Sequence, residues 1–202
     1  MIINGAVGDL EVLVDIPVDC SSIAVVCHPH PLYGGTMDNK VVYMIAKAFN
    51  GLGIGTVRFN FRGVGKSSGK FDKGMGETED LAAIVDWLNQ KYAPTELYLA
   101  GFSFGSYVVL RAFRDLKASR LLLVAPAIDR FEMAGLALTN IPTLVIQGNE
   151  DEIVSPQAVT EWIATQTYQP ELVMLPDTGH FFHAKLHQLR DTITKYFFLK
   201  KK

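Results

Sequence analysis

Short, continuously apolar runs alternate along the chain with segments whose apolar side chains recur at helical spacing. Ile23–Cys27 has no polar position, which is typical of a strand buried on both faces of a parallel sheet. Leu10–Ile16 alternates only in part, so we expect it to be antiparallel. The remaining strands are expected at 56–61, 97–102, 121–125, 143–147 and 172–175, and the helices at 39–51, from 77 to at least 88, 103–114, 155–165 and 180–199.

Strands that alternate with helices predict a mostly parallel sheet covered on both faces. The fold class is therefore α/β, doubly wound. No repeat, low-complexity block or linker interrupts residues 1–202, and this length suits one domain with a substantial core. We expect a single domain.

Composition excludes several classes of partner. The formal net charge of −2 provides no general attraction to nucleic acid or to anionic lipid. No apolar run approaches the roughly 20 residues needed to cross a bilayer, and the N-terminal residues lack the pattern of a signal peptide. Two cysteines, Cys20 and Cys27, are too few for a disulfide scaffold. We expect a cytoplasmic protein, monomeric or homodimeric, with no nucleic-acid or membrane partner.

Residues 101–105 read GFSFG, which matches the pattern G-x-S-x-G between an expected strand and an expected helix. A serine on such a strand-to-helix turn needs small neighbours, because the strained backbone leaves no room for larger side chains. The helix start places backbone N–H groups beside the hydroxyl, where they can stabilise an oxyanion. Ser103 is the candidate nucleophile.

A serine hydroxyl needs a base, and the base needs an orienting acid, in the chain order Ser, Asp or Glu, His. Asp151 lies 48 residues after Ser103 in the loop after an expected strand, and His180 lies 29 residues further on. Carboxyl ends of parallel strands meet at one edge of the sheet, so these three side chains can converge there. Asp129 also follows a strand and is the alternative acid.

The loop HPHPLYGGTMDN (residues 28–39) follows the strand Ile23–Cys27 and is where a second oxyanion N–H is expected. Prolines cannot donate. We expect the amide of Leu32 to join that of Phe104, with the amide of His30 as the alternative. His28 is expected to hold this loop through side-chain hydrogen bonds.

Together, Ser103 in GFSFG, Asp151 in GNEDEIV, His180 in TGHFF and the HPHPLYGGTMDN loop resemble the α/β-hydrolase superfamily. Within it, the chain is most similar to compact bacterial serine hydrolases with an HPHP-x-x-GG loop. The resemblance implies the α/β-hydrolase fold, no cofactor, and an ester, thioester or amide as substrate. Family members with a large lid insert it after the sixth strand. Only residues 126–140 occupy that place here, so we expect no large lid.

The stretch NFRGVGKSSG (residues 60–69) competes with this interpretation, because GVGKS looks like the end of a phosphate-binding P-loop. The pattern G-x-x-x-x-G-K-[ST] needs a glycine where Asn60 stands, and a helix directly after the loop. Residues 68–77 separate the two here, so we expect a glycine-shaped connection instead. The loop also matches the R-G-x-G-x-S pattern of the resembled family.

His180, His183 and His187 invite a metal interpretation, since His183-x-x-x-His187 has the spacing of H-E-x-x-H. Ala184 replaces the glutamate that this motif requires, and we expect no metal site.

We therefore expect a serine hydrolase that cleaves a small ester or thioester through an acyl-enzyme, with a small-molecule acyl substrate as its partner. A non-catalytic binding protein with the hydrolase fold, or an amidase or peptidase, is the alternative. Tyr33, Phe102 and Phe181 are candidate pocket residues.

Overall fold

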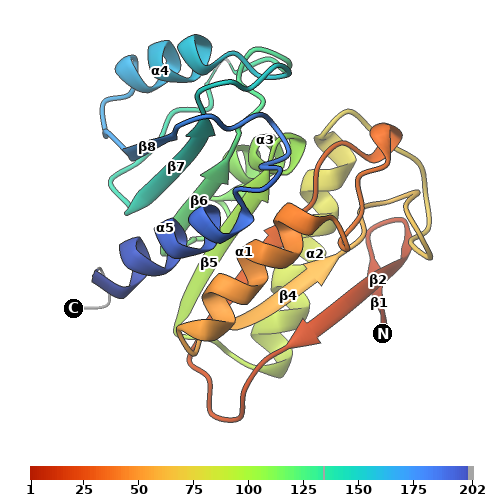
Figure 1. Cartoon of the computed structure of the whole chain (residues 1–202). Coiled ribbons are helices and arrows are strands. Elements are labelled where there is room, and N and C mark those ends of the chain that lie inside the picture. Colours follow the sequence, from red (N-terminus) through yellow and green to blue (C-terminus); the bar gives the residue numbers. More distant parts are fainter. Residues whose placement is uncertain (134, 200–202) are drawn as a thin grey trace.

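The computed structural model describes residues 1–133 and 135–199, which form one sheet flanked by helices (Figure 1). The strands are β1 (Ile2–Gly5), β2 (Gly8–Asp15), β3 (Ser22–Cys27), β4 (Gly55–Phe59), β5 (Glu96–Phe102), β6 (Arg120–Val124), β7 (Thr143–Gly148) and β8 (Glu171–Leu175). The helices are α1 (Lys40–Gly51), α2 (Met75–Lys91), α3 (Phe104–Ala112), α4 (Pro156–Ala164) and α5 (Leu186–Leu199).

The eight strands are ordered β1-β2-β4-β3-β5-β6-β7-β8. β1 and β2, like β2 and β4, pair antiparallel, and all other neighbours are parallel. The expected α/β fold with a mostly parallel sheet is confirmed, as is the antiparallel strand near the N-terminus. Sequence analysis missed β1, a four-residue strand at the sheet edge in which only Ile3 is buried.

Side chains of the central strands alternate between two apolar layers. In β3, Ile23 and Val25 pack into the layer beneath α2, α3 and α4, whereas Ala24 and Val26 pack into the layer beneath α1 and α5. Figure 1 shows α1 and α5 crossing the same face of the sheet. Because both faces are covered, β3 is apolar at every position after Ser22, as a doubly covered parallel strand should be.

The loop after β4 is built around a buried ion pair rather than a phosphate site. Arg62 donates from Nη2 and Nε to Asp80 Oδ1 at 2.8 and 3.0 Å, and its backbone N–H donates to Asp80 Oδ2 at 2.9 Å. The Ser67 hydroxyl is also engaged, donating to Asn60 O and accepting from Glu11 N. The helix α2 begins only at Met75. The geometry of a P-loop, in which the loop leads directly into a helix, is therefore not present.

Replacing Asp80 with Ala should lower the free energy of unfolding by about 3–5 kcal/mol, because it leaves the Arg62 guanidinium buried without its main partner. Glu79→Ala is the matched control, because Glu79 also contacts Arg62 but has a side chain that is 62% exposed. This substitution should lower the free energy of unfolding by less than about 1 kcal/mol. Urea unfolding of the two variants measures the difference. Equal costs would show that the exposed and the buried carboxylate support the loop alike.

Candidate active site

Ser103 occupies a sharp turn between β5 and α3. Its backbone is at φ 54° and ψ −116°, a strained conformation for a residue with a side chain. The Ser103 N–H donates to Val124 O of the adjacent β6 at 2.8 Å, which holds the turn against the sheet. The turn therefore presents the hydroxyl at the carboxyl edge of the sheet, beside the first turn of α3.

The two glycines of GFSFG are required by close backbone approach. A Cβ on Gly101 would lie 2.3 Å from the carbonyl carbon of Gly105, and a Cβ on Gly105 would lie 2.3 Å from Cys27 O. Both distances are shorter than any ordinary contact, so any side chain would push α3 away from β3 and β5. The pattern G-x-S-x-G thus follows from packing as well as from the turn itself.

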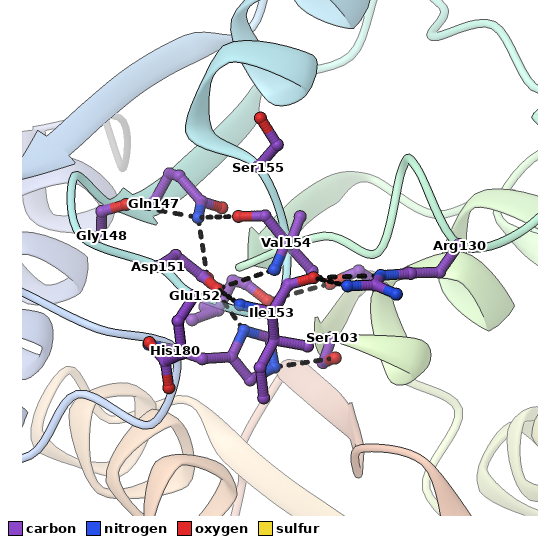
Figure 2. A network of polar contacts seen from close by, with 12 residues as sticks. Ser103, Arg130, Gln147, Gly148, Asp151, Glu152, Ile153, Val154, Ser155 and His180 are labelled. Carbon is purple, nitrogen blue, oxygen red and sulfur yellow. Dashed lines mark hydrogen bonds and ion pairs between the residues drawn. The ribbon is translucent and has the colours of Figure 1, made fainter.

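The three predicted side chains meet in one hydrogen-bonded chain (Figure 2). His180 Nε2 lies 3.0 Å from Ser103 Oγ, and His180 Nδ1 lies 2.8 Å from Asp151 Oδ2. Asp151 follows β7 and His180 follows β8, so both project from the same sheet edge as Ser103. All three residues are buried. The structure therefore brings the three predicted side chains together.

His180 lies in a loop rather than in the last helix. Sequence analysis expected that helix to begin at His180, but α5 begins at Leu186. Phe182 and Ala184 have φ values of 54° and 59°, which no right-handed helix contains. The Phe182 side chain is fully buried in the layer beneath α1 and α5. The apolar spacing that suggested a helix therefore reflects loop packing.

Asp151 is held by four donors. Oδ1 accepts from the N–H groups of Ile153 and Val154 at 2.9 and 2.8 Å, and Oδ2 accepts from Gln147 Nε2 at 2.8 Å and faces His180 (Figure 2). Burial of Asp151 disfavours the charged form, but the hydrogen bonds from His180, Val154 and Ile153 outweigh it and hold the pKa of Asp151 below its ordinary value. The carboxylate is therefore charged at neutral pH.

Gln147 was missed by sequence analysis. It is fully buried at the end of β7, and its amide nitrogen donates to the acid of the site. A polar residue directly after the apolar run LVI was the available signal.

Asp129, the alternative acid, does not contact His180. Its Oδ2 accepts from Ser155 N at 3.2 Å, and Ser155 caps the start of α4. Asp129 therefore supports a helix N-terminus, and the structure favours Asp151 as the partner of the imidazole.

The loop after β3 is anchored by His28, as expected. The His28 ring is buried; Nδ1 donates to Pro29 O at 2.6 Å and Nε2 accepts from Phe61 N at 3.0 Å. Burial lowers the pKa of His28 to about 4, although the bond to Pro29 opposes the shift. The ring is thus neutral and joins the loop to the segment after β4.

The expectation for Leu32 is corrected. The Leu32 N–H donates to His30 Nδ1 at 3.2 Å, and Leu32 does not line the cavity beside Ser103. His30 does line it, and its own N–H has no hydrogen-bond acceptor within residues 1–133 and 135–199. The tight 3₁₀ turn at Pro31–Tyr33 carries Leu32 away from the site. The His30 alternative is therefore favoured.

A cavity of about 520 Å³ opens beside Ser103 and His180. Of the candidate pocket residues, Tyr33 and Phe181 line it, whereas Phe102 does not. Phe102 is fully buried and packs behind the imidazole of His180, with ring centroids 5.1 Å apart. Sequence analysis did not assign the other lining residues to the pocket: Pro29, Gly34, Gly35 and Asn39 of the HPHPLYGGTMDN loop, and Ala127, Arg130, Phe131, Ile153 and Val154 of loops without a motif.

No cluster of three or more His, Cys, Asp or Glu side chains suited to a metal occurs in the described part of the chain. His183 and His187 are both exposed.

Among the helices of residues 1–133 and 135–199, none has the length and apolarity to span a bilayer.

Residues 32–139, just over half of the chain, match the model of the hydrolase family described as serine aminopeptidase, S33. The chain belongs to this family. The matched region contains Ser103, while Asp151 and His180 lie beyond it. The structure also resembles a lidless α/β serine hydrolase from Xanthomonas campestris, with a TM-score of 0.92 and 47% identity over 96% of this chain and 91% of the other.

Two further relatives cover most of the hydrolase chain. An α/β serine hydrolase homologue from Coxiella burnetii superposes with a TM-score of 0.93 and 42% identity, over 96% of this chain and 95% of the other. An uncharacterized protein of Rickettsia prowazekii is 37% identical over 185 residues, which is 86% of this chain and 77% of the relative. The fold is that of a lidless α/β hydrolase, as the connection between β6 and β7 predicts.

The stability of the protein should fall with acid between pH 6.5 and about 4 because of His28. An unfolded histidine binds a proton below its ordinary pKa of 6.5, whereas native His28 resists protonation down to about 4. The stabilisation is full above pH 6.5 and is lost as the pH falls to about 4, amounting to about 3 kcal/mol. Urea unfolding at a series of pH values measures the profile of the wild type. His28→Asn, although less stable at pH 8, should show a shallower profile; parallel profiles would contradict the assignment.

Proposed function

We propose that this hydrolase cleaves a small ester or thioester through an acyl-enzyme intermediate, with Ser103 as nucleophile, His180 as base and Asp151 as orienting acid. The observation that carries the proposal is the continuous chain of hydrogen bonds at 3.0 and 2.8 Å, which begins at the strained turn and opens onto a cavity. Such a chain supports nucleophilic catalysis because the base is already in contact with the hydroxyl.

In the first step Ser103 Oγ attacks the scissile carbonyl carbon while His180 Nε2 takes the hydroxyl proton. Charged Asp151 accepts from Nδ1–H, which keeps Nε2 free to act as base and stabilises the imidazolium that forms. The imidazolium then protonates the leaving alcohol or thiol, and the acyl group remains on Ser103. Water, deprotonated by His180, attacks the acyl-enzyme and releases the acid.

The oxyanion of each tetrahedral intermediate would be bound by the N–H groups of Phe104 and His30. Phe104 is the first residue of α3, so its N–H has no carbonyl within the helix to bond with. The His30 N–H is equally without an acceptor among the described residues. Two free backbone donors beside the nucleophile can stabilise negative charge that develops only during the reaction.

The cavity supports a small and mainly apolar acyl group. Its walls include Phe104, Phe131, Phe181 and Ile153, and about 520 Å³ lies within the range of small-molecule sites. No lid domain covers it in the part of the chain that the structure describes, so water and substrate can reach the site directly. This arrangement fits short-chain or compact esters and thioesters better than lipid aggregates.

The family description makes an aminopeptidase the second candidate. A free peptide N-terminus carries an ammonium, which needs an anionic or acceptor-rich partner. Within the described chain, the residues that line the cavity include no carboxylate, and one of them is the cation Arg130. This composition favours a neutral or anionic substrate, and an ester over an aminoacyl amide.

A fluorophosphonate probe should label the wild-type protein and not the Ser103→Ala variant, because the activated hydroxyl attacks phosphorus as it would a carbonyl. Gel fluorescence measures labelling. Ser106→Ala is the control: the Ser106 hydroxyl donates to Gly101 O at 2.7 Å and should not be the labelled group, so this variant should be labelled like the wild type. An unlabelled wild type would support the non-catalytic binding protein.

Asp151→Asn should lower kcat/KM for a nitrophenyl ester by roughly 10⁴-fold, because the amide favours the wrong tautomer of His180. Asp129→Asn is the matched control and should stay within about threefold, since Asp129 contacts the start of α4 and not the imidazole. A panel of nitrophenyl esters, acyl-CoA thioesters and aminoacyl amides ranks the substrate classes. A large loss in Asp129→Asn with none in Asp151→Asn would reverse the assignment.

A further inference from the structure

Among the described residues that line the cavity, Arg130 is the one permanently charged side chain. It belongs to the connection between β6 and β7, where the fold carries no lid. Its side chain is 56% exposed, so it lies at the mouth rather than in the depth of the site. A cation at the mouth of a mainly apolar cavity points to selection of the substrate by charge.

The guanidinium is fixed before any ligand arrives. Nε and Nη2 both donate to Ile153 O, with Nε at 3.0 Å (Figure 2). The next residue, Phe131, stacks on Tyr107 of α3 with ring centroids 4.6 Å apart and planes at 15°. Two anchors therefore restrain this short segment, and a preorganised arginine loses less entropy on binding than a free one.

The hydrogen bonds of Arg130 do not use all the N–H donors of its guanidinium. A guanidinium has five N–H donors, and two are engaged with Ile153 O. Asp129 lies 3.7 Å from Nε, too far for a hydrogen bond, and its other oxygen accepts from Ser155 N. Asp129 is not among the cavity-lining residues. Three of the five N–H donors of this cavity-lining residue are thus not used by the hydrogen bonds of the described residues.

We propose that Arg130 is a specificity-determining residue that selects substrates carrying a carboxylate on the acyl chain, away from the scissile carbonyl. The proposal rests on the proposed ester hydrolysis and narrows its substrate class to half-esters or half-thioesters of dicarboxylic acids. The remaining N–H donors would bind the distal carboxylate, whose charge-assisted hydrogen bonds are stronger than neutral ones. The apolar walls would contact the methylene groups between the two carbonyl carbons.

If Arg130 only supported the structure, its substitution would affect charged and neutral substrates in the same way. Its acceptor, Ile153 O, belongs to the same residue whose N–H donates to Asp151, so losing the bond can disturb the acid. Such a disturbance slows every substrate by a common factor. The ratio of kcat/KM values for a charged and a neutral ester cancels that factor and reports selectivity alone.

The experiment compares mono-nitrophenyl glutarate with nitrophenyl valerate, two esters of equal chain length that differ by the terminal carboxylate. The wild type should favour the glutarate, and Arg130→Gln should reduce the ratio of kcat/KM values about five- to tenfold, mainly through KM. Arg130→Lys should keep part of the ratio, because it retains the charge. Added salt should lower the wild-type ratio.

Arg114→Gln is the matched control. Arg114 also donates to a backbone carbonyl of the connection, that of Ala137, but it does not line the cavity, so the ratio should be unchanged. A ratio in Arg130→Gln equal to that of the wild type would overturn the proposal, even if both rates fall.

Binding to the Ser103→Ala protein gives a readout that does not depend on turnover. Calorimetry with monomethyl glutarate should show about five- to tenfold weaker binding when Arg130→Gln is added, and equal affinities would overturn the selectivity. Failure of the wild type to hydrolyse either ester would count against the proposed function, while this binding difference would still decide the role of Arg130.

Discussion

The site depends on one strained residue held where two backbones nearly touch. Ser103 adopts a positive φ because β5 must end and α3 begin within a single residue, and the turn persists because the surrounding contacts allow no relaxation. Gly105 lies directly against Cys27 O, the last residue of β3. Ser103 and the start of the loop after β3 are therefore parts of one packed unit, so neither can shift without the other.

The same edge of the sheet provides the other groups. β7 ends just before the loop that contains Asp151, and β8 ends shortly before His180. Both strands run parallel to β5, so the carboxyl ends of all three lie at the same edge of the sheet. Each partner is then restrained locally: Asp151 by the N–H groups of Ile153 and Val154, and the imidazole by Phe102 behind it. Contact between Ser103 and His180 results from strand order together with these short-range restraints.

How much the sequence reveals differs between the elements that have a recurring pattern and those that do not. Ser103, Asp151 and His180 could be predicted because chain order and the turn after each strand constrain them. Leu32 could not be assigned correctly, since the direction of its N–H depends on φ and ψ within a loop. Phe102 was assigned to the pocket, but it is the last residue of β5 and its side chain packs in the layer beneath α1 and α5. The helix expected from His180 failed because Phe182 supplies helical apolar spacing while its backbone lies in the left-handed region.

The short connection between β6 and β7 bears on how a hydrolase without a lid can select its substrate. A lid encloses the substrate and lowers the local dielectric constant, whereas an open cavity leaves bound charges screened by water. Selectivity must then come from side chains that are fixed in advance. Asp129 and Arg130 connect this segment by hydrogen bonds to residues 153–155, next to Asp151, and Arg130 also lines the cavity. One short segment can thus both restrain the loop that contains Asp151 and select the substrate by charge, whereas in a larger insertion many residues would share these two roles.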